Sequence, residues 1–222
     1  MPAKAFTIFY FLISSMSFAG QSSWTSLFTT PSGDKYENFL ALKKSEVEGV
    51  DFQTVKEYVG SSVTIIAPHA GRIELGTSEI TRAVARNSLN LYLFEGIKKS
   101  GNFELHITSD HFDEPQALAL MRVSTLGISI HGFKDDNASS IAIGGANKIV
   151  AERLAVVLQK LGFDVEFPSR RFKGENLENI VNRAITNGVQ LEISSKLRAE
   201  LLNDSAKMNA FAKGIRSAIG AT

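Results

Sequence analysis

The chain of 222 residues contains no cysteine. This absence excludes disulfide bonds, thiolate metal ligands, a cysteine nucleophile and a lipid anchor on an amino-terminal cysteine. The chain also has no excess of charge, because 24 basic residues face 23 acidic ones. No global field therefore draws the protein to nucleic acid or to an anionic membrane surface. Basic residues with interleaved aromatics, which nucleic-acid binding favours, do not cluster either, so we expect no nucleic-acid partner.

After residue 19, no apolar stretch is long enough to cross a bilayer. Residues 1–19 themselves have the pattern of a signal peptide. Lys4 is basic, residues 5–16 are apolar, and Ser17 and Ala19 are the small residues that a signal peptidase reads. We expect a mature chain that begins near Gly20, is secreted or periplasmic, and has no stable membrane association after cleavage. A permanent membrane anchor is the alternative.

The length suits one sizeable core, and no internal repeat or low-complexity tract divides the chain. We expect a lead-in segment at residues 20–60, with short helices and turns, and one domain at residues 61–222. Apolar runs and helical patterns alternate along that domain. The expected strands are 63–67, 103–108, 126–130, 141–143, 163–167 and 189–193, and the expected helices are 79–98, 116–122, 146–161, 177–186, 195–202 and 205–219. This alternation predicts a single-domain α/β three-layer sandwich with a mixed, largely parallel sheet.

Ionisable residues lie within or directly after three apolar runs. His69 and Glu74 follow the first run, His131 ends the second, and Glu192 lies within the third. Ligands collect at the carboxyl ends of strands in α/β sheets. Two imidazoles and a carboxylate around an open position, with one further carboxylate, are the set that a zinc hydrolase needs. An ionised Glu192 among aliphatic residues is costly unless it is paired, metal-bound or catalytic.

Each of these residues also has a plainer interpretation as an exposed loop histidine, a surface carboxylate or an edge-strand residue facing water. His106 and His111 are rival imidazoles. The predicted strand 103–108 packs His106 in or beside the sheet, where it can orient a metal ligand. His111 lies in a polar loop, which favours contact with solvent or substrate.

The string His-Ala-Gly-Arg-Ile-Glu-Leu-Gly-Thr-Ser-Glu at residues 69–79 resembles the signature of the poly-γ-glutamate hydrolase family, also known as phage-related replication proteins. Further blocks resemble the family in the same order, at residues 105–109, 112–115, 129–132, 143–145, 182–183 and 188–192. The resemblance covers about residues 61–198. It implies a compact relative of the zinc carboxypeptidases, with zinc on His69, Glu74 and His131 and with Glu192 as the catalytic glutamate.

Three further residues are candidates for substrate binding. Asn182 and Arg183 are similar to the Asn-Arg pair with which zinc carboxypeptidases hold substrates, and a guanidinium can bind a carboxylate through two hydrogen bonds. The alternative for Arg183 is the solvated end of a helix. The chain departs from the family at Ala70, where a second glycine is frequent, and at Arg72, where small residues are common. A cationic Arg72 at the lip of the site would change substrate preference.

The resemblance implies a secreted, monomeric, zinc-dependent hydrolase that cleaves γ-glutamyl amide bonds in poly-γ-glutamate or a similar acidic peptide. One alternative is a zinc carboxypeptidase or amidase that acts on peptidoglycan stem peptides or other small peptides. Another is a non-catalytic binding module on the same fold. Loops such as 132–139 and 168–175 would set the choice of substrate, which the sequence does not separate further.

Overall fold

The computed structural model describes residues 33–221. The predicted signal peptide at residues 1–19 lies outside them. Within the described range, no helix is both long and apolar enough to span a membrane.

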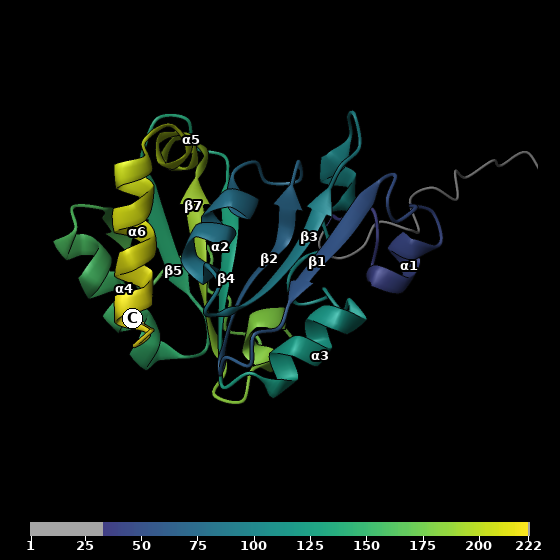
Figure 1. The fold of residues 1–222 in the computed structure, drawn as a ribbon. Helices are drawn as coiled ribbons and strands as arrows, with labels where there is room; N and C mark the ends of the chain where they lie inside the picture. Colours follow the sequence, from purple (N-terminus) through teal and green to yellow (C-terminus); the bar gives the residue numbers. More distant parts are fainter. Residues whose placement is uncertain (1–32, 222) are drawn as a thin grey trace, which may run out of the picture.

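Seven strands form one sheet in the order β1-β3-β2-β4-β7-β5-β6 (Figure 1). They are β1 (Phe52–Glu57), β2 (Val63–Gly71), β3 (Asn90–Gly96), β4 (Leu126–Phe133), β5 (Ser140–Gly144), β6 (Asp164–Glu166) and β7 (Gly188–Ser194). The pairs β1/β3 and β5/β7 are antiparallel, and the other four neighbouring pairs are parallel. The prediction of a mixed, largely parallel sheet is confirmed.

Helices cover both faces of this sheet and complete three layers. They are α1 (Phe39–Lys43), α2 (Thr77–Ala85), α3 (Pro115–Val123), α4 (Lys148–Lys160), α5 (Ser195–Asn203) and α6 (Ser205–Ala218), with short 3₁₀ helices η2 (Asn102–Leu105) and η3 (Ile180–Arg183). Helices α2, α4, α5 and α6 contribute to one apolar cluster, and α1, α3, η2 and η3 to a second. In Figure 1, α6 lies against α4, whereas α3 is separate from both.

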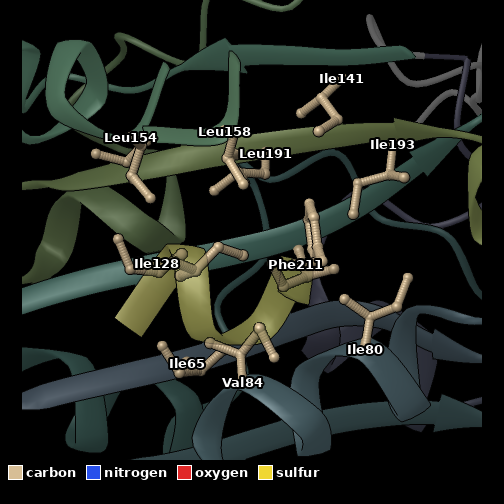
Figure 2. Close-up of a cluster of buried hydrophobic side chains, with 14 of the residues drawn as sticks. Ile65, Ile80, Val84, Ile128, Ile141, Leu154, Leu158, Leu191, Ile193 and Phe211 are labelled. Carbon is tan, nitrogen blue, oxygen red and sulfur yellow. The ribbon is translucent and has the colours of Figure 1, made fainter. Parts of the chain in front are cut away.

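The first cluster lies between the central strands and α2, α4, α5 and α6. Figure 2 shows Leu191 and Ile193 of β7 and Ile128 of β4 facing Phe211 of α6. Successive side chains of a strand point to opposite faces. The alternate residues of β4 and β7 therefore turn toward the other face, and there His131 stands in register beside Glu192.

The predicted helix at residues 79–98 is wrong. Helix α2 ends at Ala85, Arg86 adopts a positive φ of 48°, and β3 follows from residue 90. Leu91 and Leu93 have the two-residue period of a strand, and β3 lies between β1 and β2, where every residue of it is buried. The leucines of β3 suggested a continuation of the helix, because an amphipathic helix and a buried strand both place leucine in the core.

Two shorter elements also differ from prediction. Residues 103–108 form no strand, because η2 occupies residues 102–105 and His106 follows in an extended conformation. The helix expected at 177–186 is reduced to η3. Other elements predicted after residue 61 agree with the structure, including the helix at 116–122, which is α3, and the last two helices, α5 and α6.

The described part of the lead-in belongs to the domain. Strand β1 pairs with β3 along its whole length, and Phe39 and Phe52 are buried in the second cluster. The expected boundary at residue 61 falls between two strands of one sheet. Charged and polar residues dominate the described sequence before residue 61. Its few apolar residues, which pack in the core, were therefore too sparse to predict a strand.

Candidate functional site

A cleft of about 510 Å³ lies at the carboxyl ends of β2, β4 and β7. His69, Glu74, His131 and Glu192 all line it, so the structure brings the four residues of the predicted metal and catalytic set together. His106 lines it as well.

The end of β2 turns sharply and brings Glu74 back to His69. Gly71 has a φ of +66°, and a Cβ there would lie 2.7 Å from the carbonyl oxygen of Gly96, so only glycine fits. The Glu74 N–H donates to the carbonyl oxygen of His69 (3.0 Å), and Thr77 Oγ1 donates to the carbonyl of Glu74 (2.7 Å). Thr77 is thus used inside the turn, and Gly76 is the N-cap of α2.

Hydrogen bonds on the outer nitrogens orient two of the imidazoles. His69 Nε2 donates to the carbonyl oxygen of Ile107 (2.8 Å), since a carbonyl can only accept. His106 Nδ1 likewise donates to Asp34 Oδ1 (2.7 Å). His131 Nε2 contacts Ser109 Oγ at 3.4 Å. In the neutral imidazoles, these bonds leave His69 Nδ1 and His106 Nε2 unprotonated, with their lone pairs directed into the site.

The inner atoms converge on the Glu74 carboxylate. His69 Nδ1 lies 3.1 Å from Glu74 Oε1 and 3.1 Å from His131 Nδ1. His131 Nδ1 is 3.9 Å from Glu74 Oε2, and His106 Nε2 is 4.0 Å from Glu74 Oε1. Burial lowers the pKa of His69 to about 4 and also lowers the pKa values of His106 and His131. A neutral His69 Nδ1 beside Glu74 needs a shared proton or a cation, so the donor set fits a metal ion.

Ring geometry separates the two candidates for the third ligand. His69 and His106 are stacked, with centroids 3.9 Å apart and planes 32° apart. His69 and His131 meet edge to face at 63°. Nitrogen lone pairs lie in the ring plane and tetrahedral ligands approach from well-separated directions, which favours His131 over the stacked His106. His106 nevertheless forms a group with His69 and Glu74 whose ligand atoms lie within 4.8 Å of one another.

Glu192 is buried next to His131, and Gln190 Nε2 donates to its Oε1 (2.9 Å). Burial and the neighbouring Glu74 raise the pKa of Glu192 to about 8. Burial also raises the pKa of Glu74 to about 7, opposed by His106 and by the N–H of Gly132. A carboxyl whose pKa lies near neutrality can both accept and return a proton, as a general base requires.

Arg198 of α5 acts electrostatically on both carboxyl groups, and no local sequence pattern identified it as a site residue. Its Nε donates to the carbonyl of Leu75 (2.7 Å), and its Nη1 donates to the carbonyls of Phe133 and Ile193. One guanidinium thereby ties the loop after β2 to the ends of β4 and β7, and its charge lowers the pKa values of Glu74 and Glu192.

The three predicted substrate-binding residues do not line the cleft. Asn182 is buried, its Oδ1 accepts from the N–H groups of Ala146 and Gly188, and its Nδ2 donates to two loop carbonyls. Arg183 pairs with Glu178 beside a different pocket. Arg72 donates to the carbonyl of Lys98 on the surface. The Asn-Arg pair fits a structural role, because Asn182 binds the carbonyls of a loop and Arg183 pairs with Glu178.

Other basic residues line the cleft instead, namely Lys134, Arg171 and Lys173. They lie in the two loops at residues 132–139 and 168–175 that were expected to set substrate choice. The position of these loops was the only signal in the sequence for a role in substrate binding, and no local pattern identified the three basic side chains themselves.

Comparison with known proteins finds a family model described as poly-gamma-glutamate hydrolase that matches residues 36–213. The SPbeta prophage-derived protein YoqZ of Bacillus subtilis (strain 168) is 42% identical over 173 residues, which are 77% of this chain and 62% of YoqZ. The chain therefore spans less than two thirds of that relative. YndL of the same strain is 38% identical over 174 residues, covering 76% of this chain and 67% of YndL.

Two solved structures share the fold closely. A bacteriophage poly-gamma-glutamate hydrolase superimposes with a TM-score of 0.80 and 36% identity, covering 84% of this chain and 97% of the other. The zinc-free apo form of YndL gives a TM-score of 0.77 and 34% identity, covering 84% and 98%. The match from residue 36 agrees with the inclusion of α1 and β1 in the domain.

Proposed function

The chain belongs to the poly-gamma-glutamate hydrolase family, and on that premise we propose that it is a zinc-dependent hydrolase of γ-glutamyl amide bonds in poly-γ-glutamate or a similar acidic peptide. One observation carries the proposal. Inward-facing imidazole nitrogens surround the Glu74 carboxylate in the same cleft as Glu192, a second buried carboxyl with a raised pKa.

His69, Glu74 and His131 would hold the ion. His69 Nδ1 lies 3.1 Å from both Glu74 Oε1 and His131 Nδ1, and the His131 ring stands at 63° to the His69 ring, so the two imidazoles would approach an ion from different directions. When bound, zinc supplies Lewis acidity for a carbonyl oxygen and a lowered pKa for water. The zinc-free form of YndL, a relative that shares the fold, supports this choice of metal.

Glu192 moves the proton in the proposed reaction. Its Oε1 accepts the hydrogen bond from Gln190, which leaves Oε2 to take a proton from the attacking water. The same oxygen then protonates the departing amine nitrogen, so the C–N bond breaks without expelling a strongly basic amide anion.

The direct test incubates the purified protein with poly-γ-glutamate and, separately, with peptidoglycan, each with and without a zinc chelator. We expect the average length of poly-γ-glutamate to fall, a chelator to stop the reaction, and added zinc to restore it. Intact poly-γ-glutamate in the presence of zinc refutes the proposed substrate. Undiminished hydrolysis after exhaustive chelation refutes the metal dependence. Cleavage of peptidoglycan alone would select the stem-peptide alternative.

Export and a monomeric state are also part of the proposal. The pattern of residues 1–19 supports export, and the sequence offers no signal for assembly. Amino-terminal sequencing of the extracellular fraction should find a start near Gly20, and an intact Met1 in the cytosol would contradict it. Light scattering should give the mass of one chain.

A further inference from the structure

The cleft has one strongly basic wall. Lys134, Arg171 and Lys173 line it from the end of β4 and from the loop before η3. Asp110 also lines the cleft, and its carboxylate accepts a hydrogen bond from Asn176 Nδ2 (2.8 Å). The basic side chains thus share the cleft with the two buried carboxyl groups of Glu74 and Glu192.

Arg171 is held in this wall by aromatic rings. Its guanidinium carbon lies 4.5 Å from the Phe172 ring centroid and 5.7 Å from that of Phe133, and the two rings are 5.2 Å apart. Among residues 33–221, no carboxylate pairs with Arg171, in contrast to Arg183, which is bound to Glu178. The positive charge is close enough to Glu192 to lower the pKa of that carboxyl. Arg171 therefore lines the cleft without a hydrogen-bond or ion-pair partner in the part of the chain that the structure describes.

The backbone on both sides of Arg171 is anchored. The N–H of Ser169 donates to the carbonyl of Ile143 (3.0 Å), and Ser169 Oγ accepts from the N–H of Phe172 (2.9 Å). The carbonyl of Lys173 accepts from the N–H of Gly145 (2.8 Å). A group fixed in advance loses less entropy when it binds a ligand, so this loop is suited to recognition.

We propose that Arg171 binds the free α-carboxylate of the substrate residue on the amine side of the scissile bond, an inference that rests on the proposed function. In a γ-linked glutamate chain, the carbon attached to the amide nitrogen carries a free carboxylate. Within an α-linked chain, that carbon carries the next peptide bond, and the carboxylate lies at the end of the side chain. A guanidinium beside the departing amine therefore distinguishes γ-linked from α-linked chains, and its planar donors match a carboxylate.

The test compares R171Q with R170Q. Arg170 is the adjacent arginine and is exposed, as Arg171 is, but it lines a different pocket, so it is the matched control for loss of one charge from the same loop. Two substrates are needed: a γ-linked glutamate oligomer, and the same oligomer with a carboxamide in place of the α-carboxylate on the amine side. R171Q should lower kcat/KM on the first about 10- to 100-fold, as for loss of a charged hydrogen bond, and change the second less than about 3-fold. R170Q should leave both unchanged.

An equal loss on both substrates would show that Arg171 acts only through the structure of the loop, and no loss on the first would show that it does not bind the carboxylate. Binding of the γ-linked oligomer to E192Q protein, measured by calorimetry, is independent of turnover. Adding R171Q should weaken that binding about 10-fold or more, and unchanged binding overturns the inference. A parent protein that binds the oligomer through Arg171 and never cleaves it would instead refute the proposed function alone.

Discussion

The two faces of strands β4 and β7 differ sharply in chemistry. On one face, Ile128, Leu191 and Ile193 pack in an aliphatic cluster against α4 and α6 (Figure 2). On the other face of the same strands, His131 and Glu192 are buried in the cleft. Full burial of a leucine or isoleucine stabilises the fold by about 1.5–3 kcal/mol, whereas burial disfavours the charged form of a carboxyl. The aliphatic face thus offsets the cost of burying the ionisable groups behind it.

Removal of His131, a proposed metal ligand on the polar face, should have the largest effect. We expect H131A to lose most of its bound zinc and with it the activity, because two remaining protein ligands compete poorly with water. The fold should persist, since the aliphatic face is untouched. Elemental analysis after dialysis measures the zinc. H106A is the matched control, and it should retain about one ion because the stacked ring is not a ligand. The reverse result would assign the site to His69, Glu74 and His106.

E192Q tests the proton transfer on the same face. The amide keeps the shape of the side chain and removes the base, so the rate of γ-glutamyl hydrolysis should fall about 10²- to 10⁴-fold. Zinc content and the free energy of unfolding should not decrease, because a buried ionisable group is replaced by a neutral one. Initial rates, elemental analysis and urea denaturation measure the three quantities. E152Q, at an exposed position on α4, should match the parent. A near-parental rate in E192Q would exclude Glu192 as the base.

On the aliphatic face, L191A should show the opposite profile. The cavity left in the cluster should lower the free energy of unfolding by about 2–5 kcal/mol. Zinc content and rate per folded molecule should stay close to parental, because Leu191 points away from the cleft. Urea denaturation monitored by circular dichroism provides the measurement. L177A, at an exposed leucine, should lower the free energy of unfolding far less. A selective loss of activity in folded L191A would show that the two faces are not independent.

The smallest effect is a pH dependence of stability in the metal-stripped protein. Folded Glu74 and Glu192 have pKa values raised to about 7 and about 8 from the ordinary 4.5, so the folded state holds protons that the unfolded chain releases. Their contribution to stability is lost as pH rises. The buried imidazoles have lowered pKa values and act in the opposite direction, but only below their ordinary value of 6.5.

Between pH 6.5 and 8, the free energy of unfolding should therefore fall, by at most about 1.4 kcal/mol per pH unit for each carboxyl. Urea denaturation with chelator present measures this decline. E192Q should flatten it above pH 7 by removing the higher of the two pKa values. A constant or rising free energy over this range would show that the carboxyls do not hold protons in the fold.

Much of the architecture was accessible from local patterns. Strands with a clear apolar run, such as β2 and β7, and helices such as α3 were predicted in place. Strand β3 was not, because its leucines follow a helix without a strong breaker, and only pairing with β1 and β2 selects the extended conformation. Strand β1 was missed because its outward-facing residues are charged and polar.

The sequence by itself determined which strands carry ionisable residues, because His69, His131 and Glu192 stand in or directly after apolar runs. It also supplied Gly71, which permits the turn that returns Glu74 to His69. Only the tertiary structure decided their surroundings. Arg198 is 123 residues from Leu75, whose carbonyl it binds, and Arg171 reaches the cleft from a loop with no periodic pattern. Local sequence encodes alternation along one strand, whereas contacts between distant segments depend on the order of strands in the sheet, which no short pattern specifies.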